Sequence, residues 1–420
     1  MRILLLTQVA PFPPDAGPKV KTYYLLRKLS ESHDVDLVTF VRDGREREAA
    51  RELQALCSSV TTVDLDRKKW REPFYAARGW STGTPFLVAR DRRAAMARIV
   101  RERLASGEVD VVHADQLSMA QYLPPSGKAK PGRLKTVFDA HNAVWKLVQS
   151  LAGDQPTVAH RAAAAVEWRL LRGFEGRVCR EADLTLTVST IDARELEKAA
   201  GRPFNVAVAP IGIETQDVEQ TPVSQDHRRI LSVATMHYPP NADALRWFRD
   251  RVWPLLSDAE RSAGLDIVGS RTPRDLVQWS ESSAHVQAPG YVPDLAPYYR
   301  QAGIFIVPLH AGSGMRVKIL EAMARGLPVV STSIGVEGLP VRDGEQLLVA
   351  DDPELFSRLV AELLADPDRR RELGAAAREF SRRYDWRVCL EPVVDAYRQL
   401  EAAPELSALQ GGARLQAQKS

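Results

Sequence analysis

Short apolar runs alternate along the chain with longer stretches of helical hydrophobic period, and this alternation restricts the fold more than any other feature. The runs are almost continuously apolar, as in strands that helices cover on both faces of a parallel sheet. The chain therefore predicts an α/β fold built from βα units. In the first half the predicted strands are Ile3–Thr7, Asp36–Phe40, Val60–Asp64, Val109–His113, Thr136–Asp139 and Leu184–Val188.

A second series of the same kind begins near Arg229, and 420 residues exceed what one hydrophobic core usually supports. Two doubly wound domains in series are therefore predicted, with ligands outside the carboxyl ends of the strands. The predicted boundaries are 1–210 for the first domain, 211–228 for a polar linker and 229–383 for the second domain. A helix is expected at 384–401, crossing back to the first domain, and a disordered tail at 402–420.

Composition excludes several classes of protein. A formal net charge of +3 without a basic block argues against a nucleic-acid partner. Three widely spaced cysteines fit neither a zinc site nor a disulfide framework, and they indicate reduced thiols in a cytosolic protein. No apolar run approaches the roughly 20 residues of a membrane span, and the first residues suit a buried strand better than a secretion signal. We therefore expect a cytoplasmic protein.

The segment from Pro308 to Ser331 predicts a strand, a glycine-containing loop and a helix. The start of such a helix binds anions, because its free N–H groups and its dipole favour negative charge. Arg316 and Lys318 add two positive charges there, so a diphosphate is the natural ligand. Glu321 follows one turn later and is able to accept hydrogen bonds from a ribose diol. The alternative interpretation is a solvated helix face on which these three side chains pair.

Several motifs in a fixed order resemble glycosyltransferase family 4. The stretch from Gly312 to Thr332 resembles the donor-binding signature of that family. Shorter matches are similar in order and spacing: Phe12–Gly17, Asp139–Asn142, Pro239–Asp243, Ile267–Gly269, Gly290–Asp294, Gly335–Leu339 and Asp343–Leu348. The resemblance implies a GT-B architecture, in which two Rossmann-like, doubly wound parallel-sheet domains face a central cleft. It also implies sugar transfer from a UDP- or GDP-sugar with retention of configuration, without a cofactor and without a metal.

The resemblance assigns a role to individual residues. His141 would face the sugar near the reacting carbon, and Arg316 and Lys318 would receive the diphosphate and stabilise its charge. Glu321 would bind the ribose. The remaining donor-binding positions are Gly17 in the first loop, Gly269 beside the nucleotide, Tyr291 and Val292 near the base, and Ser313, Gly314 and Met315 in the signature loop.

Three positions depart from the family pattern. Ser313 stands where many members have a glutamate, the loop Thr235–Asn241 lacks the usual Arg/Lys pair, and Pro18 replaces a glycine. We infer that Arg316 and Lys318 take over the neutralisation of charge. Two acidic pairs, Asp64 with Asp66 and Asp351 with Asp352, lack a third ligand and do not predict a metal site.

A basic and aromatic segment distinguishes the first half. Asp66 to Arg103 contains eleven Lys or Arg against four Asp or Glu, interleaved with Trp70, Phe74, Tyr75, Trp80 and Phe86. Such a mixture suits an anionic membrane surface. It predicts a peripheral protein on the inner face of a membrane, acting on a lipid-linked or other glycan acceptor in polysaccharide biosynthesis. The alternative is a solvated helical face with buried aromatic rings.

Two other functions fit part of the pattern. A nucleotide-sugar-binding protein without transferase activity agrees with Ser313 and with the uncharged loop Thr235–Asn241. A sugar-nucleotide epimerase would need its own acid and base, for which no carboxylate pair is evident.

Overall fold

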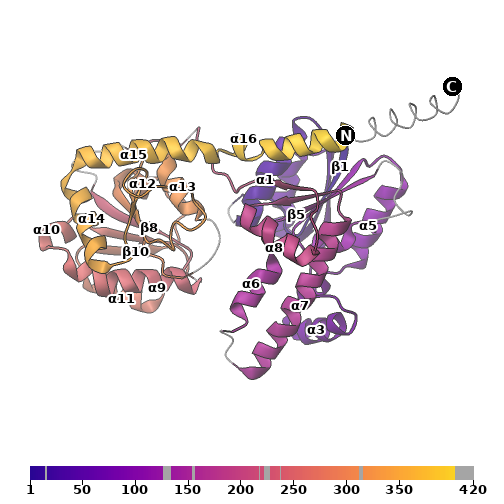
Figure 1. Ribbon diagram of the computed structural model, residues 1–420, viewed down its shortest axis with the longest axis horizontal. Coiled ribbons are helices and arrows are strands. Elements are labelled where there is room, and N and C mark those ends of the chain that lie inside the picture. Colours follow the sequence, from indigo (N-terminus) through magenta and orange to yellow (C-terminus); the bar gives the residue numbers. More distant parts are fainter. Residues whose placement is uncertain are drawn as a thin grey trace. The chain divides into compact units, whose positions relative to one another are not determined.

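A computed structural model describes residues 1–14, 17–125, 134–153, 157–216, 218–221, 228–236, 238–311 and 316–402, without the side chains of Pro18 and Lys69. The chain divides into two compact units. Unit 1 comprises Met1–Pro210 together with the segment from Leu390 onward, and unit 2 comprises Ile211–Cys389. Each unit is an α/β layer structure with helices on both sides of its sheet (Figure 1).

Unit 1 holds a parallel sheet of seven strands in its described part, in the order β3-β2-β1-β4-β5-β6-β7. The strands consist mostly of β-branched and apolar residues, and the inner ones are buried on both faces, as covered parallel strands must be. Their bounds are β1 (Arg2–Thr7), β2 (Asp34–Val41), β3 (Ser59–Asp64), β4 (Val111–Asp115), β5 (Lys135–Ala140), β6 (Leu184–Thr187) and β7 (Val206–Val208).

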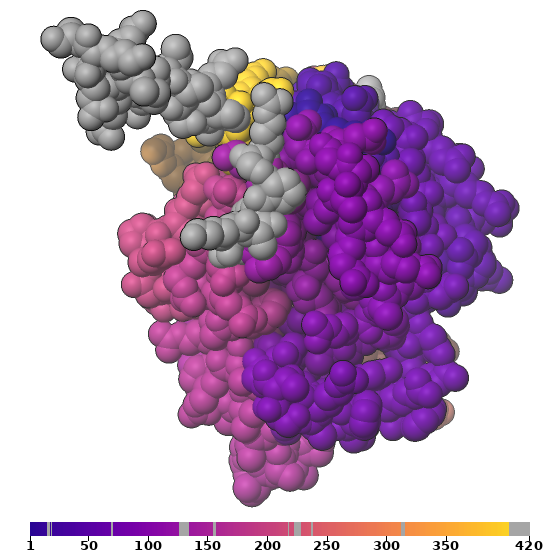
Figure 2. Space-filling model, turned by 90° about the vertical axis from the view of Figure 1, so that its right-hand side faces the viewer, coloured from indigo at the N-terminus to yellow at the C-terminus, as the bar shows by residue number. Residues whose placement is uncertain are grey.

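The helices of unit 1 connect these strands, and some begin at a capping side chain: the hydroxyl of Ser189, just before the helix that opens at Thr190, accepts the backbone N–H of Asp192. The α-helices are α1 (Gly17–Ser30), α2 (Gly44–Arg51), α3 (Glu72–Ser81), α4 (Phe86–Ala89), α5 (Ala94–Ala105), α6 (Val144–Leu151), α7 (Val158–Glu181) and α8 (Thr190–Ala200). Short 3-10 turns are η1 (Glu52–Ala55), η2 (Lys69–Arg71) and η3 (Met119–Tyr122). Figure 2 views unit 1 from the side, where the violet of α3 lies against the magenta of α7.

Unit 2 holds a second parallel sheet, with six strands in the order β10-β9-β8-β11-β12-β13 in its described part. The central strand β11 is completely buried. The bounds are β8 (Arg229–Val233), β9 (Leu265–Val268), β10 (Val286–Gly290), β11 (Ala302–Val307), β12 (Val329–Ser331) and β13 (Leu348–Val349).

The helices of unit 2 again alternate with the strands. Pro239 and Pro353 each open a helix, where the missing N–H of proline has no cost. The α-helices are α9 (Pro239–Trp247), α10 (Asp258–Arg261), α11 (Arg274–Ser282), α12 (Ala296–Gln301), α13 (Val317–Ala324), α14 (Pro353–Ala365), α15 (Pro367–Ser381) and α16 (Trp386–Cys389). A π-helical turn, η4 (Phe248–Val252), and the 3-10 turns η5 (Trp253–Leu255) and η6 (Arg382–Tyr384) complete the set.

The predicted fold class, with two doubly wound parallel sheets, is confirmed. Strand β4 differs from the prediction, because it begins and ends two residues later and therefore includes Asp115. The described part of 211–228 packs on unit 2: Ile213 is buried in its core, and the Thr221 N–H donates to the Arg325 carbonyl over 2.8 Å. Residues 391–402 form a helix that belongs to unit 1. Among the described residues, no helix combines the length and the apolar composition that crossing a bilayer requires.

Candidate functional site

The strand order of unit 2 determines where a ligand site is expected. Successive connections leave β8 in one direction toward β9 and β10, and the chain then returns to the other side of β8 with β11. The two neighbouring strands β8 and β11 therefore form the topological switch point of the sheet. In sheets of this kind the loops at the carboxyl ends of these two strands diverge and leave a crevice for the ligand.

Arg316 and Lys318 lie at this switch point, at the start of α13 after β11. The Lys318 Nζ donates to Asn241 Oδ1 over 3.3 Å, and Asn241 belongs to the segment after β8. Asn241 in turn donates from its Nδ2 to the Thr235 carbonyl over 2.9 Å. The side chain of Arg316 is buried. Lys318 thus links the two segments that border the crevice, and the buried Arg316 lies two residues before it.

Burial shifts the pKa values of the side chains in this site. Desolvation, helped by the neighbouring Arg316, lowers the pKa of Lys318 to about 7. Burial also lowers the pKa of the Arg316 guanidinium and raises the pKa of Glu321. Positive charge at this helix start is therefore unfavourable without a counter-ion, since the helix dipole opposes it as well. A bound anion would relieve the repulsion.

Glu321 lies one turn further along α13, where Arg325 holds the local backbone. The Arg325 Nη1 donates to the Glu321 carbonyl over 2.8 Å, and the Arg325 guanidinium lies 4.1 Å from the centre of the Tyr299 ring. The alternative interpretation, a solvated helix face, does not describe these side chains, because Arg316 is buried and neither Lys318 nor Glu321 is exposed. The carboxylate of Glu321 lies near the two cations in sequence but forms none of the described ion pairs with them.

Gly269 follows β9 at the same edge of the sheet, and the backbone there requires glycine. Its φ is +157°, and a β-carbon would lie 1.7 Å from the Ala234 carbonyl oxygen. The Gly269 N–H donates to the Gly290 carbonyl over 2.9 Å. The loops after β8, β9 and β10 are consequently packed backbone to backbone, which brings the neighbouring Tyr291 and Val292 to this edge.

Replacing Gly269 by alanine is expected to reduce the free energy of unfolding by about 1–3 kcal/mol, because backbone must move to accommodate the new methyl group. Chemical denaturation measures the loss. The control is Gly344→Ala. At Gly344 φ is also positive, but no described atom lies within 4 Å of a β-carbon, so this variant measures the loss of stability from the positive φ without the steric clash. Equal losses at both positions would contradict the steric explanation.

The other predicted donor positions divide into two groups. Tyr291 is largely exposed, and Val292 packs on the core of unit 2. Ser313, Gly314 and Met315 lie outside the described residues. The signature loop is thus represented in the structure by its two ends, His310–Ala311 and Arg316.

In unit 1 the switch point lies between β1 and β4. Gly17 opens α1 after β1, and no atom of the described residues lies within 4 Å of the position that a β-carbon would take there. The first turns of α1 also carry Lys21 and Thr22, whose side chains are buried beneath the carboxyl ends of the strands. Sequence reasoning missed both residues, since they look like the polar face of a helix.

His141 follows β5 and is held by Asp115. The His141 Nε2 donates to Asp115 Oδ1 over 2.8 Å, and the Thr22 hydroxyl lies 3.1 Å from each Asp115 oxygen. Since a carboxylate accepts only, Nε2 carries the hydrogen, and Nδ1 is the ring nitrogen left for a ligand. Asp115 is a site residue that the sequence prediction did not include.

A second layer lies below His141. The Lys21 ammonium pairs with Asp139, both side chains being buried. The His113 Nε2 lies 3.7 Å from Asp139 Oδ2, and the His113 Nδ1 lies 2.5 Å from the hydroxyl of Tyr397. His113 is therefore a buried internal residue, because β4 continues past it to Asp115.

Asp115, Asp139 and His141 each offer one ligand atom within 4.8 Å of the other two, close enough for a metal ion. However, Lys21 already pairs with Asp139, and Thr22 and His141 already bind Asp115. The donor set is thus engaged by side chains of unit 1. The cluster is therefore a network of hydrogen bonds and one buried ion pair within unit 1.

Comparison with known proteins matches both halves of the chain to glycosyltransferase profiles. A sequence profile described as Glycosyltransferase Family 4 matches residues 17–217, and one described as Glycosyl transferases group 1 matches residues 227–366. The chain is a group 1 glycosyltransferase of the family 4 type. The predicted family and the predicted enzyme class are thereby confirmed.

Two relatives match this glycosyltransferase over different shares of its length. An uncharacterized 44.6 kDa protein in the cps region of Klebsiella pneumoniae is 22% identical over 85% of this chain and 89% of that protein. The D-inositol 3-phosphate glycosyltransferase of Acidothermus cellulolyticus is 30% identical over 56% of this chain and 57% of that protein. The chain thus spans little more than half the length of this second relative.

Solved structures share the fold of this glycosyltransferase. Sucrose-phosphate synthase from Thermosynechococcus elongatus superimposes with a TM-score of 0.64 at 17% identity, over 96% of this chain and 100% of that chain. HepE from Anabaena, in complex with UDP, gives a TM-score of 0.62 at 14% identity, over 95% of this chain and 100% of that chain. The GT-B class of fold is thus confirmed for the two domains.

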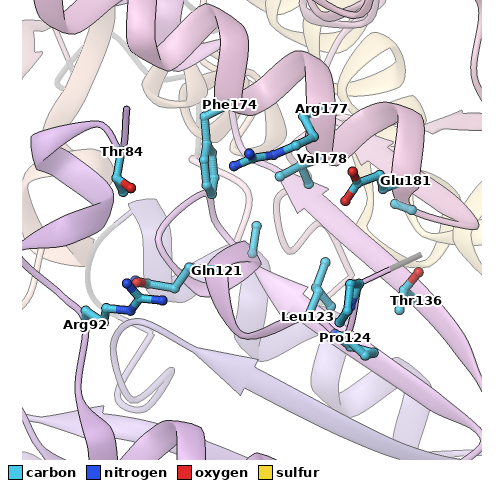
Figure 3. A pocket seen from close by; sticks show the side chains of 13 residues that line it. Thr84, Arg92, Gln121, Leu123, Pro124, Thr136, Phe174, Arg177, Val178 and Glu181 are labelled. Carbon is cyan, nitrogen blue, oxygen red and sulfur yellow. The ribbon is translucent and has the colours of Figure 1, made fainter. Parts of the chain in front are cut away.

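The glycosyltransferase also has cavities away from the predicted residues. One of about 380 Å³ lies beside α7, where Arg92 and Arg177 line it from opposite sides (Figure 3). Another of about 510 Å³ lies in unit 2, beside α15. Neither is lined by a residue that the sequence predicted for the donor or for catalysis.

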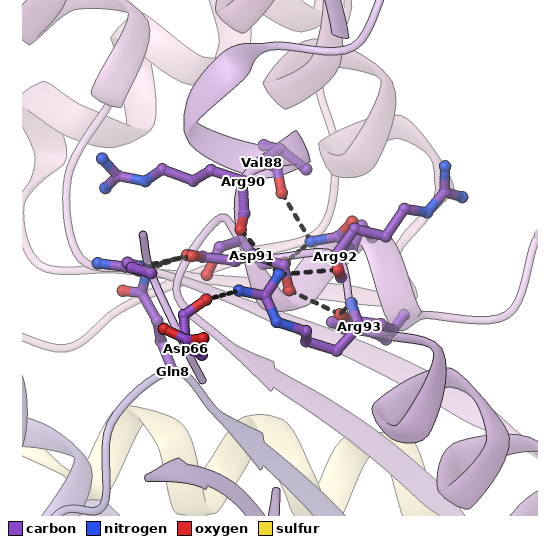
Figure 4. A network of polar contacts seen from close by, with 11 residues as sticks. Gln8, Asp66, Val88, Arg90, Asp91, Arg92 and Arg93 are labelled. Carbon is purple, nitrogen blue, oxygen red and sulfur yellow. Dashed lines mark hydrogen bonds and ion pairs between the residues drawn. The ribbon is translucent and has the colours of Figure 1, made fainter. Parts of the chain in front are cut away.

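A buried carboxylate, Asp91, ties together loops at the carboxyl edge of unit 1 (Figure 4). It accepts from Gln8 Nε2 over 2.6 Å, and from Arg67 Nε and Nη2 over 2.8 and 2.6 Å. Gln8 follows β1 and Arg67 follows β3. The segment between α4 and α5 is therefore fixed to the edge that carries Gly17 and His141.

Proposed function

We propose that this glycosyltransferase transfers a sugar from a UDP- or GDP-sugar to a glycan or lipid-linked acceptor, with retention of configuration and without a metal or cofactor. The observation that carries the proposal is the pair Arg316 and Lys318 at the switch point of unit 2, where Lys318 donates a hydrogen bond to Asn241. Buried cations at such a crevice fit a diphosphate better than any neutral ligand.

The chemistry of the reaction accounts for the pair. When the sugar leaves a nucleotide diphosphate, negative charge develops on a phosphate oxygen, and positive groups fixed beforehand stabilise that charge most effectively. Arg316, Lys318 and the start of α13 would supply it in place of a metal. Glu321 would hold the ribose, Gly269, Tyr291 and Val292 would border the nucleotide, and Ser313, Gly314 and Met315 would complete the donor loop.

His141 would act on the sugar from unit 1, next to a Gly17 loop that leaves space for the donor phosphates. Asp115 would keep the hydrogen of His141 on Nε2, so that Nδ1 accepts a hydrogen bond from a sugar hydroxyl. Lys21 and Asp139 would hold this arrangement in place from below. Metal independence is part of the proposal, since Lys21 supplies a positive charge within the Asp115–Asp139–His141 cluster.

Names of similar proteins favour particular substrates. The structures of HepE contain UDP and UDP-glucose, which favours a UDP-sugar as the donor. Relatives named D-inositol 3-phosphate glycosyltransferase suggest a phosphorylated polyol as one acceptor to try. The Klebsiella relative belongs to a cps region, which agrees with polysaccharide synthesis. We place the enzyme in the cytoplasm, peripheral to the inner face of the membrane.

The lowered pKa of Lys318 predicts how donor binding depends on pH. Above about pH 7 the free enzyme holds Lys318 neutral, so binding a diphosphate requires uptake of a proton. Affinity for UDP-glucose should be constant below pH 7 and fall up to about tenfold per pH unit above it. Isothermal titration calorimetry in buffers of different ionisation enthalpy measures the proton uptake. Lys318→Met should abolish the slope, and an unchanged slope would contradict the assignment.

A product assay tests the function itself. The enzyme is incubated with radiolabelled UDP- and GDP-sugars, with EDTA present, and with D-inositol 3-phosphate or a membrane lipid extract as the acceptor. Transfer of label, with the donor anomer preserved by NMR, supports the proposal. An epimerised donor would instead support an epimerase. Donor binding with neither product nor donor hydrolysis would support the second candidate, a nucleotide-sugar-binding protein, which the uncharged loop after β8 favours.

A further inference from the structure

Helix α7 extends well beyond the sheet that it covers. It contains 24 residues and is about 36 Å long, whereas β5 has 6 residues and spans about 20 Å. The end of α7 lies beside the start of β5, since the Thr136 N–H donates to Asp183 over 2.7 Å. The start of α7 must therefore project past the carboxyl edge, where α6 also leaves the sheet after His141 (Figure 1).

Helix α3 is built onto this projection. The buried Glu167 of α7 accepts from Trp80 Nε1 over 2.8 Å and from the N–H groups of Phe86 and Leu87 over 2.9 and 3.0 Å. The rings of Trp145 in α6 and Trp168 in α7 lie 6.4 Å apart. The segment η2–α3, helix α6 and residues 158–172 of α7 thus form one packed projection, which we call the edge arm.

Large apolar side chains are exposed on the edge arm. Trp70 is 72% exposed and Phe74 is 62% exposed, on η2 and α3, and Val158 is 73% exposed at the start of α7. Leu147 and Leu151 of α6 and Val166 of α7 are exposed as well. Exposed apolar groups gathered on one projection mark a contact surface, whereas scattered ones do not.

Cations accompany these apolar groups. Arg71 lies 4.8 Å from the Trp70 ring centre, Arg169 lies 4.5 Å from that of Trp168, and Arg172 lies 5.3 Å from that of Trp145. Several carboxylates of the region face inward: Asp91, Glu167 and Glu175 are buried and bind Arg67 or backbone N–H groups. The outer surface of the edge arm is therefore apolar and cationic.

We infer that the edge arm docks on an anionic lipid bilayer. Trp and Phe side chains favour the interface between headgroups and acyl chains, and arginines beside them bind lipid phosphates. The edge arm starts at the same sheet edge as His141, so docking would bring the acceptor side of the enzyme to the membrane. This inference deepens the proposed function, because it names the surface from which a lipid-linked acceptor is taken.

Vesicle co-sedimentation tests the inference with the full chain. At about 50 mM salt, vesicles with a third of phosphatidylglycerol should retain the protein at least tenfold more strongly than pure phosphatidylcholine vesicles, and about 500 mM salt should release it. Trp70→Ala/Phe74→Ala should weaken retention about tenfold or more. The matched control is Leu255→Ala, a similarly exposed side chain at 52% in unit 2, which should retain wild-type binding.

Two results would overturn the inference: equal binding to neutral and anionic vesicles, or equal loss in the Leu255→Ala control. Concentration-dependent self-association without vesicle binding, measured by light scattering, would also overturn it and assign the surface to a second copy. UDP affinity measured without vesicles should be the same for all variants. That control separates failure of membrane docking from failure of the proposed donor site.

Discussion

Replacing Lys318 by alanine is expected to weaken the binding of UDP or GDP about 100-fold. Removing one partner of a buried, charge-assisted contact costs about 2–5 kcal/mol, and 1.4 kcal/mol corresponds to a factor of ten. Lys318 is the only lysine between Lys198 and Lys419, so unit 2 contains no second lysine that could replace it. Arg316→Ala should have a similar effect, and the double variant should bind no nucleotide at millimolar concentration. Isothermal titration calorimetry gives the affinities.

Arg300→Ala is the matched control for the loss of charge. Arg300 is an exposed residue of unit 2 that pairs with Glu219 over 3.1 Å, and its removal takes away one full positive charge. The control should bind nucleotide within about twofold of the wild type, since an exposed pair contributes little. If Arg300→Ala weakened binding as much as Lys318→Ala, a general effect of charge would replace the specific site.

Replacing Lys21 by methionine is expected to reduce the free energy of unfolding of unit 1 by about 3–5 kcal/mol. Burial opposes ionisation of Asp139, but Lys21 and the two histidines hold its pKa below the ordinary value, so the carboxylate is charged in the folded protein. Without Lys21 that charge would be buried with no cation beside it. Urea denaturation followed by circular dichroism measures the change.

Two further variants make the measurement specific. Lys28→Met alters the same helix at an exposed pair, where Lys28 lies 2.6 Å from Glu31, and it should cost less than about 1 kcal/mol. Lys21→Met/Asp139→Asn removes both charges and should recover part of the loss. If the double variant lost more free energy of unfolding than the two single variants combined, the ion pair would not be what stabilises this region.

Much of the fold was predictable, because buried parallel strands are short apolar runs that can be recognised in a single sequence. The run Leu265–Val268 was located to the residue. The prediction for strand β4 lies two residues too early, because a charged residue such as Asp115 is expected in a loop. In the structure Thr22 and His141 bind its carboxylate, so the strand continues to Asp115. The three-residue edge strand β7 was missed, because Val206–Val208 is too short to show a period.

The candidate site was likewise predictable only in part. The charges of Arg316 and Lys318 were apparent because strand, loop and helix are adjacent in sequence. The hydrogen bond of Lys318 to Asn241 crosses 77 positions and depends on β8 and β11 being neighbours. Lys21 and Asp139 are 118 positions apart, and a lysine on an amphipathic helix gives no sign that it points inward. Pairings of this kind depend on tertiary structure, which hydrophobic periodicity does not encode.

A crystal structure of the full chain with UDP bound tests the central claim most directly. The predicted result is a diphosphate within hydrogen-bond distance of both the Arg316 guanidinium and the Lys318 ammonium, outside the carboxyl ends of β8 and β11. A diphosphate bound elsewhere, with these two side chains unchanged from the free protein, would contradict the account.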